Sequence, residues 1–360
     1  MTEALRIGGE PVVRLMAQDA PATGPAFLEA SVLPGRGMML LQAKLRLPSG
    51  QVVDAIAAPE PHAAARVLDG GPEDFAGDKS FSFGGAILAP YANRIRGRPV
   101  EGAREIETEV AGRTVRLPRN WGGKAAGAEQ YAMHGLILDA RVPWRQAAPS
   151  RVTGRLEAAD FGGRWPGRAA LDFDWRLEGG GLSLRVSAAN IGTGPLPMGL
   201  GWHPYFALPS GERRQARLWM PARSRTVVGN YDEVLPTGEI EAVAGGPYDF
   251  RASGGRALGE TYLDDCFTDL ERAAGNAMAE IRDPASGFGL RLASASPQVR
   301  AMQVYAPPDK AFIVVEPQFN LADPYGPEWR GRDTGMALIP PGGSVAYDAR
   351  LTAFPAAVDS

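Results

Sequence analysis

Alternation of apolar and polar residues gives the strongest local patterns in this chain. Residues 41–50 (LQAKLRLPSG) and 168–190 (RAALDFDWRLEGGGLSLRVSAAN) alternate in this way and are bounded by glycine, proline or asparagine, which is typical of half-buried β-strands. In the second segment, LDFDWRL and LSLRVSA flank Glu-Gly-Gly-Gly, and glycine readily takes the positive φ angles of a tight turn. We therefore predict a β-hairpin over residues 168–190.

Strands are expected along most of the remaining chain. Residues 311–319 (AFIVVEPQF) form a β-branched run, whereas a helical pattern is weak outside residues 59–69 (PEPHAAARVLD). The 45 glycines and 31 prolines leave few places for long helices. No βαβ alternation, fixed repeat or compositional boundary divides the chain. We predict an all-β fold, a large antiparallel β-sandwich forming a single domain over residues 1–360.

Composition limits the partners and the cellular location. With 38 basic and 41 acidic residues and a net charge of -3, the chain offers no broad basic field for nucleic acid. The single cysteine, Cys266, excludes an internal disulfide and a zinc site of several thiolates. The N-terminus has no signal-peptide pattern, and no segment reaches the ~18 apolar residues of a membrane span. We expect a cytoplasmic protein, monomer or homodimer, that binds a neutral small molecule and uses no cofactor or metal.

Histidine is the natural candidate for proton transfer near neutral pH, and only three histidines occur. His62 lies among alanines and prolines, where a structural or exposed role is expected. His203 in MGLGWHPYFALP lies beside aromatic residues that suit a sugar pocket, although a histidine packed in an aromatic core fits the same pattern. His134 in YAMHGLILDARVPW is compatible with either a ligand contact or an ordinary turn.

Candidate acids and hydrogen-bond donors lie in three further segments. Glu316 ends the apolar run AFIVVEPQF, where partial burial would raise its pKa and make it a better base, although it could equally point to solvent. Asn93 and Arg94 in GGAILAPYANRIRGR could present donors to hydroxyl oxygens or lie on the surface. In TYLDDCFTDL, only one of Asp264 and Asp265 can face a pocket if the segment is a strand.

Taken in order, these segments resemble the aldose 1-epimerase (galactose mutarotase) family. HPYFAL, starting at His203, is the most specific match to that family's motifs. The segment DDCF aligns Asp264 with the family's sugar-binding aspartate. The other matching segments are YANRI with its flanking glycines, MHGLILDARVPW with His134 and Trp144, EPQ at Glu316, and PPGGSVAYDARLTAF near the C-terminus; together they span about residues 30–355.

The resemblance implies a galactose mutarotase-like supersandwich with a sugar-sized cleft and no cofactor. It implies that Glu316 acts as the base on the C1 hydroxyl and His203 as the acid on the ring oxygen. From ordinary solution pKa values we expect their charged forms to coexist at about pH 5–6. The implied sugar-binding residues are Arg94, His134, Asp264 and Asn93.

Departures from the family pattern concern the choice of sugar. Ala207 stands where an asparagine is usual, Asp265 stands where galactose-type enzymes commonly have histidine, and the segment after Glu316 is longer than usual. A hexose 6-phosphate mutarotase, with Arg94, Arg96 and Arg98 as its basic cluster, is the nearest alternative. A non-catalytic sugar-binding or sensory protein of the same fold, and a carbohydrate hydrolase or lyase using Asp264 and Glu316, are the others.

Overall fold

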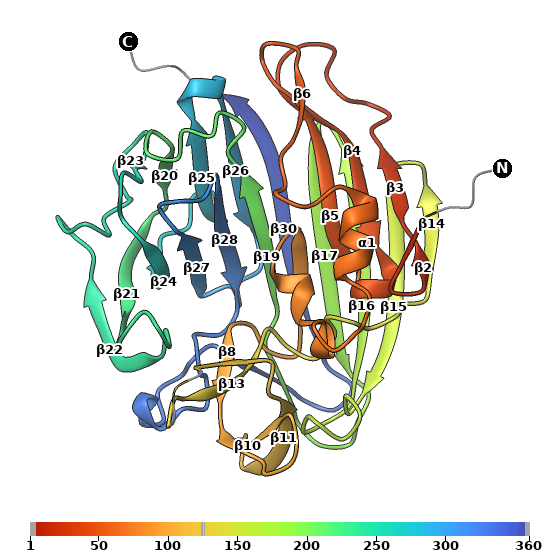
Figure 1. Cartoon of the computed structure of the whole chain (residues 1–360), viewed down its shortest axis with the longest axis vertical. Coiled ribbons are helices and arrows are strands. Elements are labelled where there is room, and N and C mark those ends of the chain that lie inside the picture. The colour runs from red at the N-terminus through yellow and green to blue at the C-terminus, as the bar shows by residue number, and fades with distance from the viewer. Residues whose placement is uncertain (1–4, 124, 126, 357–360) are drawn as a thin grey trace.

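The computed structural model describes residues 5–123, 125 and 127–356. It confirms the all-β prediction, because two large antiparallel sheets form a sandwich (Figure 1) and α1 (Pro61–Val67) is the one α-helix of the described residues. The short helical pattern predicted over residues 59–69 corresponds to α1. No helix in this part of the chain combines the length and apolar character needed to cross a membrane.

One sheet has 11 strands and carries His203 and Glu316 on two of them. Strands from the N-terminal third form one side of it and strands from the C-terminal half form the other. Its order is β22 (Pro236–Ala242), β21 (Ala222–Val228), β24 (Leu263–Leu270), β27 (Ala301–Ala306), β28 (Phe312–Gln318), β19 (Gly201–Ala207), β7 (Gly85–Leu88), β5 (Met39–Arg46), β4 (Ala26–Leu33) and β3 (Val13–Met16), with β6 (Val52–Asp54) paired to β5.

The second sheet has nine strands and contains the predicted hairpin. β16 (Ala169–Glu178) and β17 (Gly181–Asn190) pair along their length, and Gly179 and Gly180 turn between them with φ angles of 58° and 71°, as expected of a two-residue type I′ turn. The sequence predicted this hairpin correctly. The other strands, in sheet order around this pair, are β14 (Trp144–Ala148) and β15 (Arg151–Ala159) before it, and β30 (Ser344–Pro355), β26 (Phe288–Ser294), β25 (Ala277–Asp283), β20 (Arg217–Trp219) and β23 (Arg256–Ala257) after it.

Large aromatic side chains fill the space between the two sheets. Trp175 of β16 meets Trp202 of β19 edge to face, with ring centroids 5.6 Å apart. Both indole nitrogens donate to backbone carbonyls, of Met38 and Gly85, so neither buried N–H lacks a partner. Since Trp202 and His203 are neighbours on a strand, anchoring Trp202 in the core directs His203 to the opposite face of the sheet.

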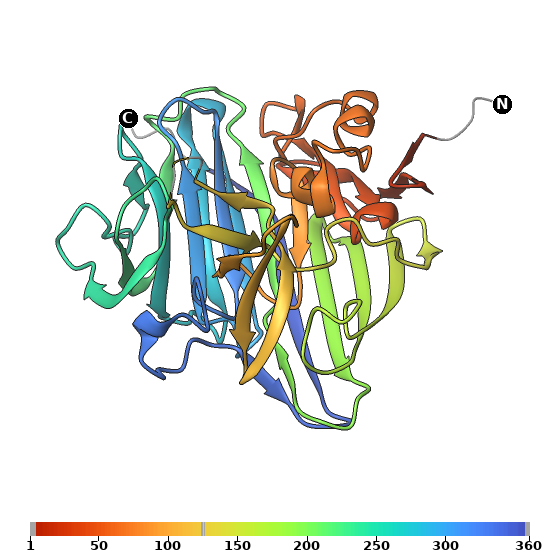
Figure 2. The same cartoon turned by 60° about the horizontal axis from the view of Figure 1, so that its bottom comes forward.

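Smaller elements complete the chain and lie mostly over one face of the 11-stranded sheet. Figure 2 shows the segment around residues 94–133, in gold, in front of the strands that carry the site. These small sheets are β8 (Arg94–Arg96), β13 (Gln130–Met133) and β12 (Trp121–Gly122); and β9 (Arg98–Pro99), β10 (Glu105–Val110) and β11 (Arg113–Pro118). The remaining elements are β1 (Arg6–Ile7) with β2 (Glu10–Pro11), β18 (Leu196–Met198) with β29 (Ala337–Ile339), and 3-10 helices at Pro34–Arg36, Phe75–Phe81, Pro284–Ser286 and Pro327–Trp329.

Candidate active site

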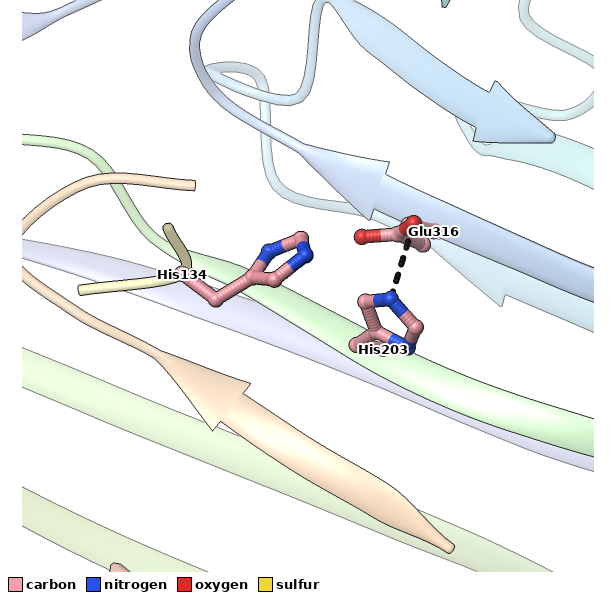
Figure 3. Close-up of side chains that lie close together, drawn as sticks. All are labelled: His134, His203 and Glu316. Carbon is pink, nitrogen blue, oxygen red and sulfur yellow. Dashed lines mark ion pairs between the residues drawn. The ribbon is translucent and has the colours of Figure 1, made fainter. Parts of the chain in front are cut away.

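His203 and Glu316 lie side by side on two central strands of the 11-stranded sheet. β19 and β28 are antiparallel with Gly201 opposite Gln318, so His203 and Glu316 face each other on the same side. Nε2 of His203 is 3.4 Å from Oε1 of Glu316 (Figure 3), and both side chains are buried. Strand pairing alone therefore holds an imidazole and a carboxyl group close enough to exchange a proton after a small shift.

His134 reaches the same point from a tight turn after β13. Its φ is 63° and that of Gly135 is 88°, and its backbone N–H donates to the carbonyl of Asn93 over 2.7 Å. The ring centroids of His134 and His203 are 4.6 Å apart, and Figure 3 shows the His134 ring directed toward the other two side chains. The structure thus brings His134 to the pair, and the His-Gly turn considered from the sequence is what places it there.

Replacement of Gly135 by alanine should destabilise the fold and displace His134. A Cβ atom at this position would lie 2.2 Å from the carbonyl oxygen of Ala89, so the strain of the positive φ adds to a backbone clash. We expect Gly135→Ala to lower the free energy of unfolding by roughly 2 kcal/mol or more, measured by urea denaturation. Gly112→Ala is the matched control, because Gly112 has a similar φ of 77° and no atom within 4 Å of a Cβ; equal losses in the two variants would contradict the clash.

Arg94 enters the cavity from β8 and is held by its neighbours. Its Nε donates to Oδ1 of Asn93 over 3.0 Å, and its Nη1 donates to the carbonyl of Glu233 over 2.8 Å. Nδ2 of Asn93 donates to Oε1 of Gln303 over 3.0 Å. Both polar atoms of the Asn93 amide are therefore engaged within the protein. The sequence suggested that this amide contacts sugar hydroxyls, whereas its observed contacts fix the orientation of Arg94 and Gln303.

Asp264 is the member of the acidic pair that faces the cavity. Nε2 of Gln303 donates to its Oδ1 over 2.6 Å, and burial raises its pKa to about 6 against the opposing effect of Arg94. Asp265 lies on the other face of β24, fully buried, where Arg225 pairs with it. Strand alternation therefore separates the two carboxylates, as the sequence indicated.

Replacement of Asp264 by asparagine should stabilise the protein in a pH-dependent manner. The folded pKa of about 6 exceeds the ordinary value of 3.8, so the carboxyl group contributes its stability below about pH 3.8 and loses it as the pH rises through about 6. At pH 7.5 we expect Asp264→Asn to raise the free energy of unfolding by on the order of 1 kcal/mol, and the gain to shrink as the pH falls to 4.5. Urea denaturation between pH 4.5 and 7.5 measures this difference in the free energy of unfolding, with Asp139→Asn at an exposed position as the control. A gain in stability that does not change with pH would contradict the raised pKa of Asp264.

Burial dominates the protonation of the central pair. It lowers the pKa of His203 to about 4 and raises the pKa of Glu316 well above its usual range, because neither charged form is well solvated there. Burial, with the neighbouring His203 and Arg94, also lowers the pKa of His134. Burial therefore favours the protonated form of the Glu316 carboxyl group and the neutral forms of the two imidazoles. The charged pair expected at about pH 5–6 rests on solution pKa values, which do not include this desolvation, and burial opposes both charged forms.

These side chains share one cavity of about 410 Å³, within the range of small-molecule sites. Every residue selected from the sequence as catalytic or sugar-binding lines it. Neither His62, which is exposed on α1, nor Trp144, on the edge strand β14, is among the lining residues. The six selected residues are His203, Glu316, Arg94, His134, Asp264 and Asn93.

Further lining residues were missed by the sequence reasoning. Gln303 lies opposite Glu316 in the pairing of β27 with β28. The sequence signal that could have identified it is a polar amide within the otherwise apolar run AMQVYA. The aromatic wall comes from segments far apart along the chain, and no local pattern connects them. Its members are Phe81, Trp121, Tyr205, Tyr231, Tyr262, Tyr305 and Phe312.

The arginines considered for a phosphate site do not converge. Arg96 lies within ion-pair distance of three carboxylates, those of Asp323, Glu328 and Glu129, and the exposed Arg98 pairs with Glu107. Asp323 belongs to the long segment after Glu316, and its backbone N–H donates to the carbonyl of Arg94 over 2.8 Å. The long segment after Glu316 is therefore hydrogen-bonded to β8, the strand that carries Arg94. Of the three arginines, Arg94 alone lines the cavity.

His134, His203 and Glu316 are also the residues that could hold a metal ion. Each offers one ligand atom, and these atoms lie within 4.8 Å of one another; two imidazoles and a carboxylate suit Zn²⁺. Such an ion would bind through the same imidazole and carboxylate atoms that face one another in the cavity.

Comparison with known proteins identifies the family. The aldose 1-epimerase family model matches residues 49–333, so the chain belongs to the aldose 1-epimerase family. No curated protein sequence matches it.

Solved structures share its fold at low sequence identity. A galactose mutarotase-like protein from Clostridium acetobutylicum has 18% identity and a TM-score of 0.71, covering 92% of this chain and 93% of its own. An aldose epimerase homologue from C. elegans has 18% identity and a TM-score of 0.71, with 96% and 99% covered. A galactose 1-epimerase from Lactobacillus acidophilus has 18% identity and a TM-score of 0.63, with 93% of each chain covered. The predicted mutarotase-like sandwich is therefore confirmed.

Proposed function

We propose that this protein is an aldose 1-epimerase that interconverts the α and β anomers of a free aldose. The observation that carries the proposal is the His203–Glu316 pair, with Nε2 and Oε1 3.4 Å apart, in a cavity of a chain that belongs to this family. Anomer exchange requires proton transfer at two oxygens of the sugar, the C1 hydroxyl and the ring oxygen. An adjacent base and acid meet that requirement without a nucleophile or cofactor.

In ring opening, Glu316 accepts the proton of the C1 hydroxyl while His203 donates its proton to the ring oxygen. The bond between C1 and the ring oxygen breaks and C1 becomes an aldehyde. Rotation about the C1–C2 bond presents the other face of the aldehyde. Reclosure then runs the same proton transfers in reverse, so that no proton is gained or lost over a turnover.

Burial favours the protonation that the pair has at the open-chain stage of this cycle. After ring opening, Glu316 holds a proton and His203 is neutral, which is the state that burial favours. Ring opening starts from the opposite state, with Glu316 as a carboxylate and His203 protonated, which burial disfavours. Sugar hydroxyls that donate hydrogen bonds to the carboxylate favour this starting state, because hydrogen bonds to the charged form stabilise it.

Arg94, Asp264 and His134 would hold the sugar hydroxyls and fix the ring over the pair. Hydrogen bonds to charged groups contribute about 1.5–3 kcal/mol each, and these groups approach the cavity from three different elements. In this proposal Asn93 acts by orienting Arg94. The ion pairs of Arg96 and Arg98 leave no converging cluster for a 6-phosphate, which favours a free sugar over a hexose 6-phosphate.

We further propose that the chain acts as a single cytoplasmic domain, as a monomer or homodimer. Residues of both large sheets contribute to one main hydrophobic core, which supports a single domain. Size-exclusion chromatography with light scattering tests the oligomeric state.

Polarimetry of freshly dissolved α-D-glucose and α-D-galactose tests the activity. We expect the approach to the equilibrium rotation to accelerate in proportion to protein concentration with at least one of them. If neither sugar responds while glucose 6-phosphate does, the proposal of a free aldose fails. If none of the three responds, the protein is not an aldose 1-epimerase for these sugars, and a binding role becomes the better account.

A further inference from the structure

A basic groove runs beside the cavity and shares one wall with it. The groove has a volume of about 1170 Å³, and its charged lining residues are Arg96, Arg98, Arg104, Arg119 and Glu129, of which Arg96 and Glu129 pair with each other. Trp121 lines both the groove and the cavity and is 52% exposed. Its ring contacts Phe81, which in turn contacts His134. A molecule that fills the cavity can therefore extend over Trp121 into the groove.

Two arginines lie opposite each other at the open end of the β10–β11 hairpin. Glu105 pairs with Pro118, and the N–H of Arg119 donates to the carbonyl of Arg104 over 2.9 Å. Like charges in opposed positions of an antiparallel pair are destabilising. An anion that lies near both guanidinium groups would offset such repulsion.

Neither guanidinium has a carboxylate at ion-pair distance within residues 5–123, 125 and 127–356. Arg104 stacks 3.8 Å from the ring centroid of Phe75 and donates to the carbonyl of Pro72, and Asp78 acts on it only as a more distant charge. By contrast, Arg98 is paired with Glu107. The groove thus keeps two uncompensated positive charges in a protein of net charge -3.

We propose that Arg104 and Arg119 bind an anionic group on a sugar unit linked to the reacting sugar, so that the substrate class includes acidic oligosaccharides with a free reducing end. This inference rests on the proposed function. The reducing sugar occupies the cavity, the linked ring packs its C–H face on Trp121, and its carboxylate meets the arginines. Guanidinium groups recognise carboxylate, sulfate and phosphate by paired hydrogen bonds, and the flat indole ring offers apolar area to a pyranose.

The test compares cellobiouronic acid with cellobiose, which differ by a carboxylate in place of a hydroxymethyl group. Anomer exchange is followed by NMR at low ionic strength. We expect kcat/KM to favour the acid by about fivefold to tenfold, the size of a partly exposed charged contact. Arg119→Gln should remove most of this preference through KM, Arg119→Lys should restore part of it, and about 1 M NaCl should suppress it by screening.

Arg113→Gln is the matched control, because Arg113 is an exposed arginine at the start of β11, the strand that Arg119 directly follows, and does not line the groove. The proposal is overturned if the acid and the neutral disaccharide react equally, or if Arg113→Gln changes the preference as Arg119→Gln does. A preference for glucose 6-phosphate without one for cellobiouronic acid also overturns it, since the anion would then lie on the reacting ring. Turnover of D-glucose without any preference for the acid refutes only this inference, whereas absence of turnover of every sugar refutes the proposed function.

Discussion

Glu316→Gln is expected to lower kcat for anomer exchange by about a thousandfold, within the range of ~10²–10⁴ that a positioned proton donor or acceptor contributes. The amide has nearly the shape of the carboxyl group but cannot accept the C1 proton. Because burial raises the pKa of Glu316, folding at neutral pH must either take up a proton at this carboxyl or bury its charge. The amide has neither cost, so the stability of the variant should be equal or higher. NMR magnetisation exchange between anomers measures the rate, and thermal unfolding measures the stability.

A matched glutamate separates this effect from a general loss of buried charge. Glu280 is 6% exposed, lies on β25 of the other sheet and pairs with Arg282 and Arg291. Glu280→Gln should leave kcat unchanged. Retention of more than a tenth of the wild-type kcat by folded Glu316→Gln protein would remove Glu316 from the base role.

His203→Ala is expected to lower kcat by about a hundredfold or more, since it removes the group that protonates the ring oxygen. The loss should be smaller than for Glu316→Gln because the vacated space admits a water molecule as a weak proton donor. Added imidazole should restore part of the rate in this variant, a response that a purely structural role would not give.

The exposed histidine of α1 provides the control for this experiment. His62→Ala should match the wild type with and without imidazole. An unchanged rate in folded His203→Ala protein, or a loss that imidazole and its analogues leave untouched, would argue against the acid role.

Local sequence patterns predicted where the strands of this protein lie better than they predicted which strands pair with each other in the sheets. Alternation predicted the β16–β17 hairpin because its two strands follow each other in the sequence and are joined by Gly179 and Gly180. Both strands and the turn that pairs them therefore lie in one short segment. The buried run of β28 was predicted as a strand, but its place between β27 and β19 depends on segments about ten to a hundred residues away. No periodicity in a single segment encodes that choice.

In the site, too, the residues that short segments reveal were predicted, and the contacts between distant segments were not. Its histidines and acids were found because few residue types transfer protons and because short segments resemble family motifs. Gln303 was missed because its role comes from lying opposite Glu316. Apart from Tyr205 beside His203, the aromatic wall was missed because its members come from segments far apart in the sequence. The effect of burial on the pKa values of the pair was not predicted, because desolvation depends on how completely the folded chain encloses the side chains.

The last strand of the chain lies in the middle of its sheet, which has a consequence for biosynthesis. β30 separates β17 from β26, and β28, another late strand, carries Glu316 into the centre of the other sheet. A nascent chain that has not yet released these strands has an unfilled gap in both layers and no complete acid–base pair. Folding to an active protein is therefore expected to await the release of β30 from the ribosome, and exposed strand edges before that point favour interaction with chaperones.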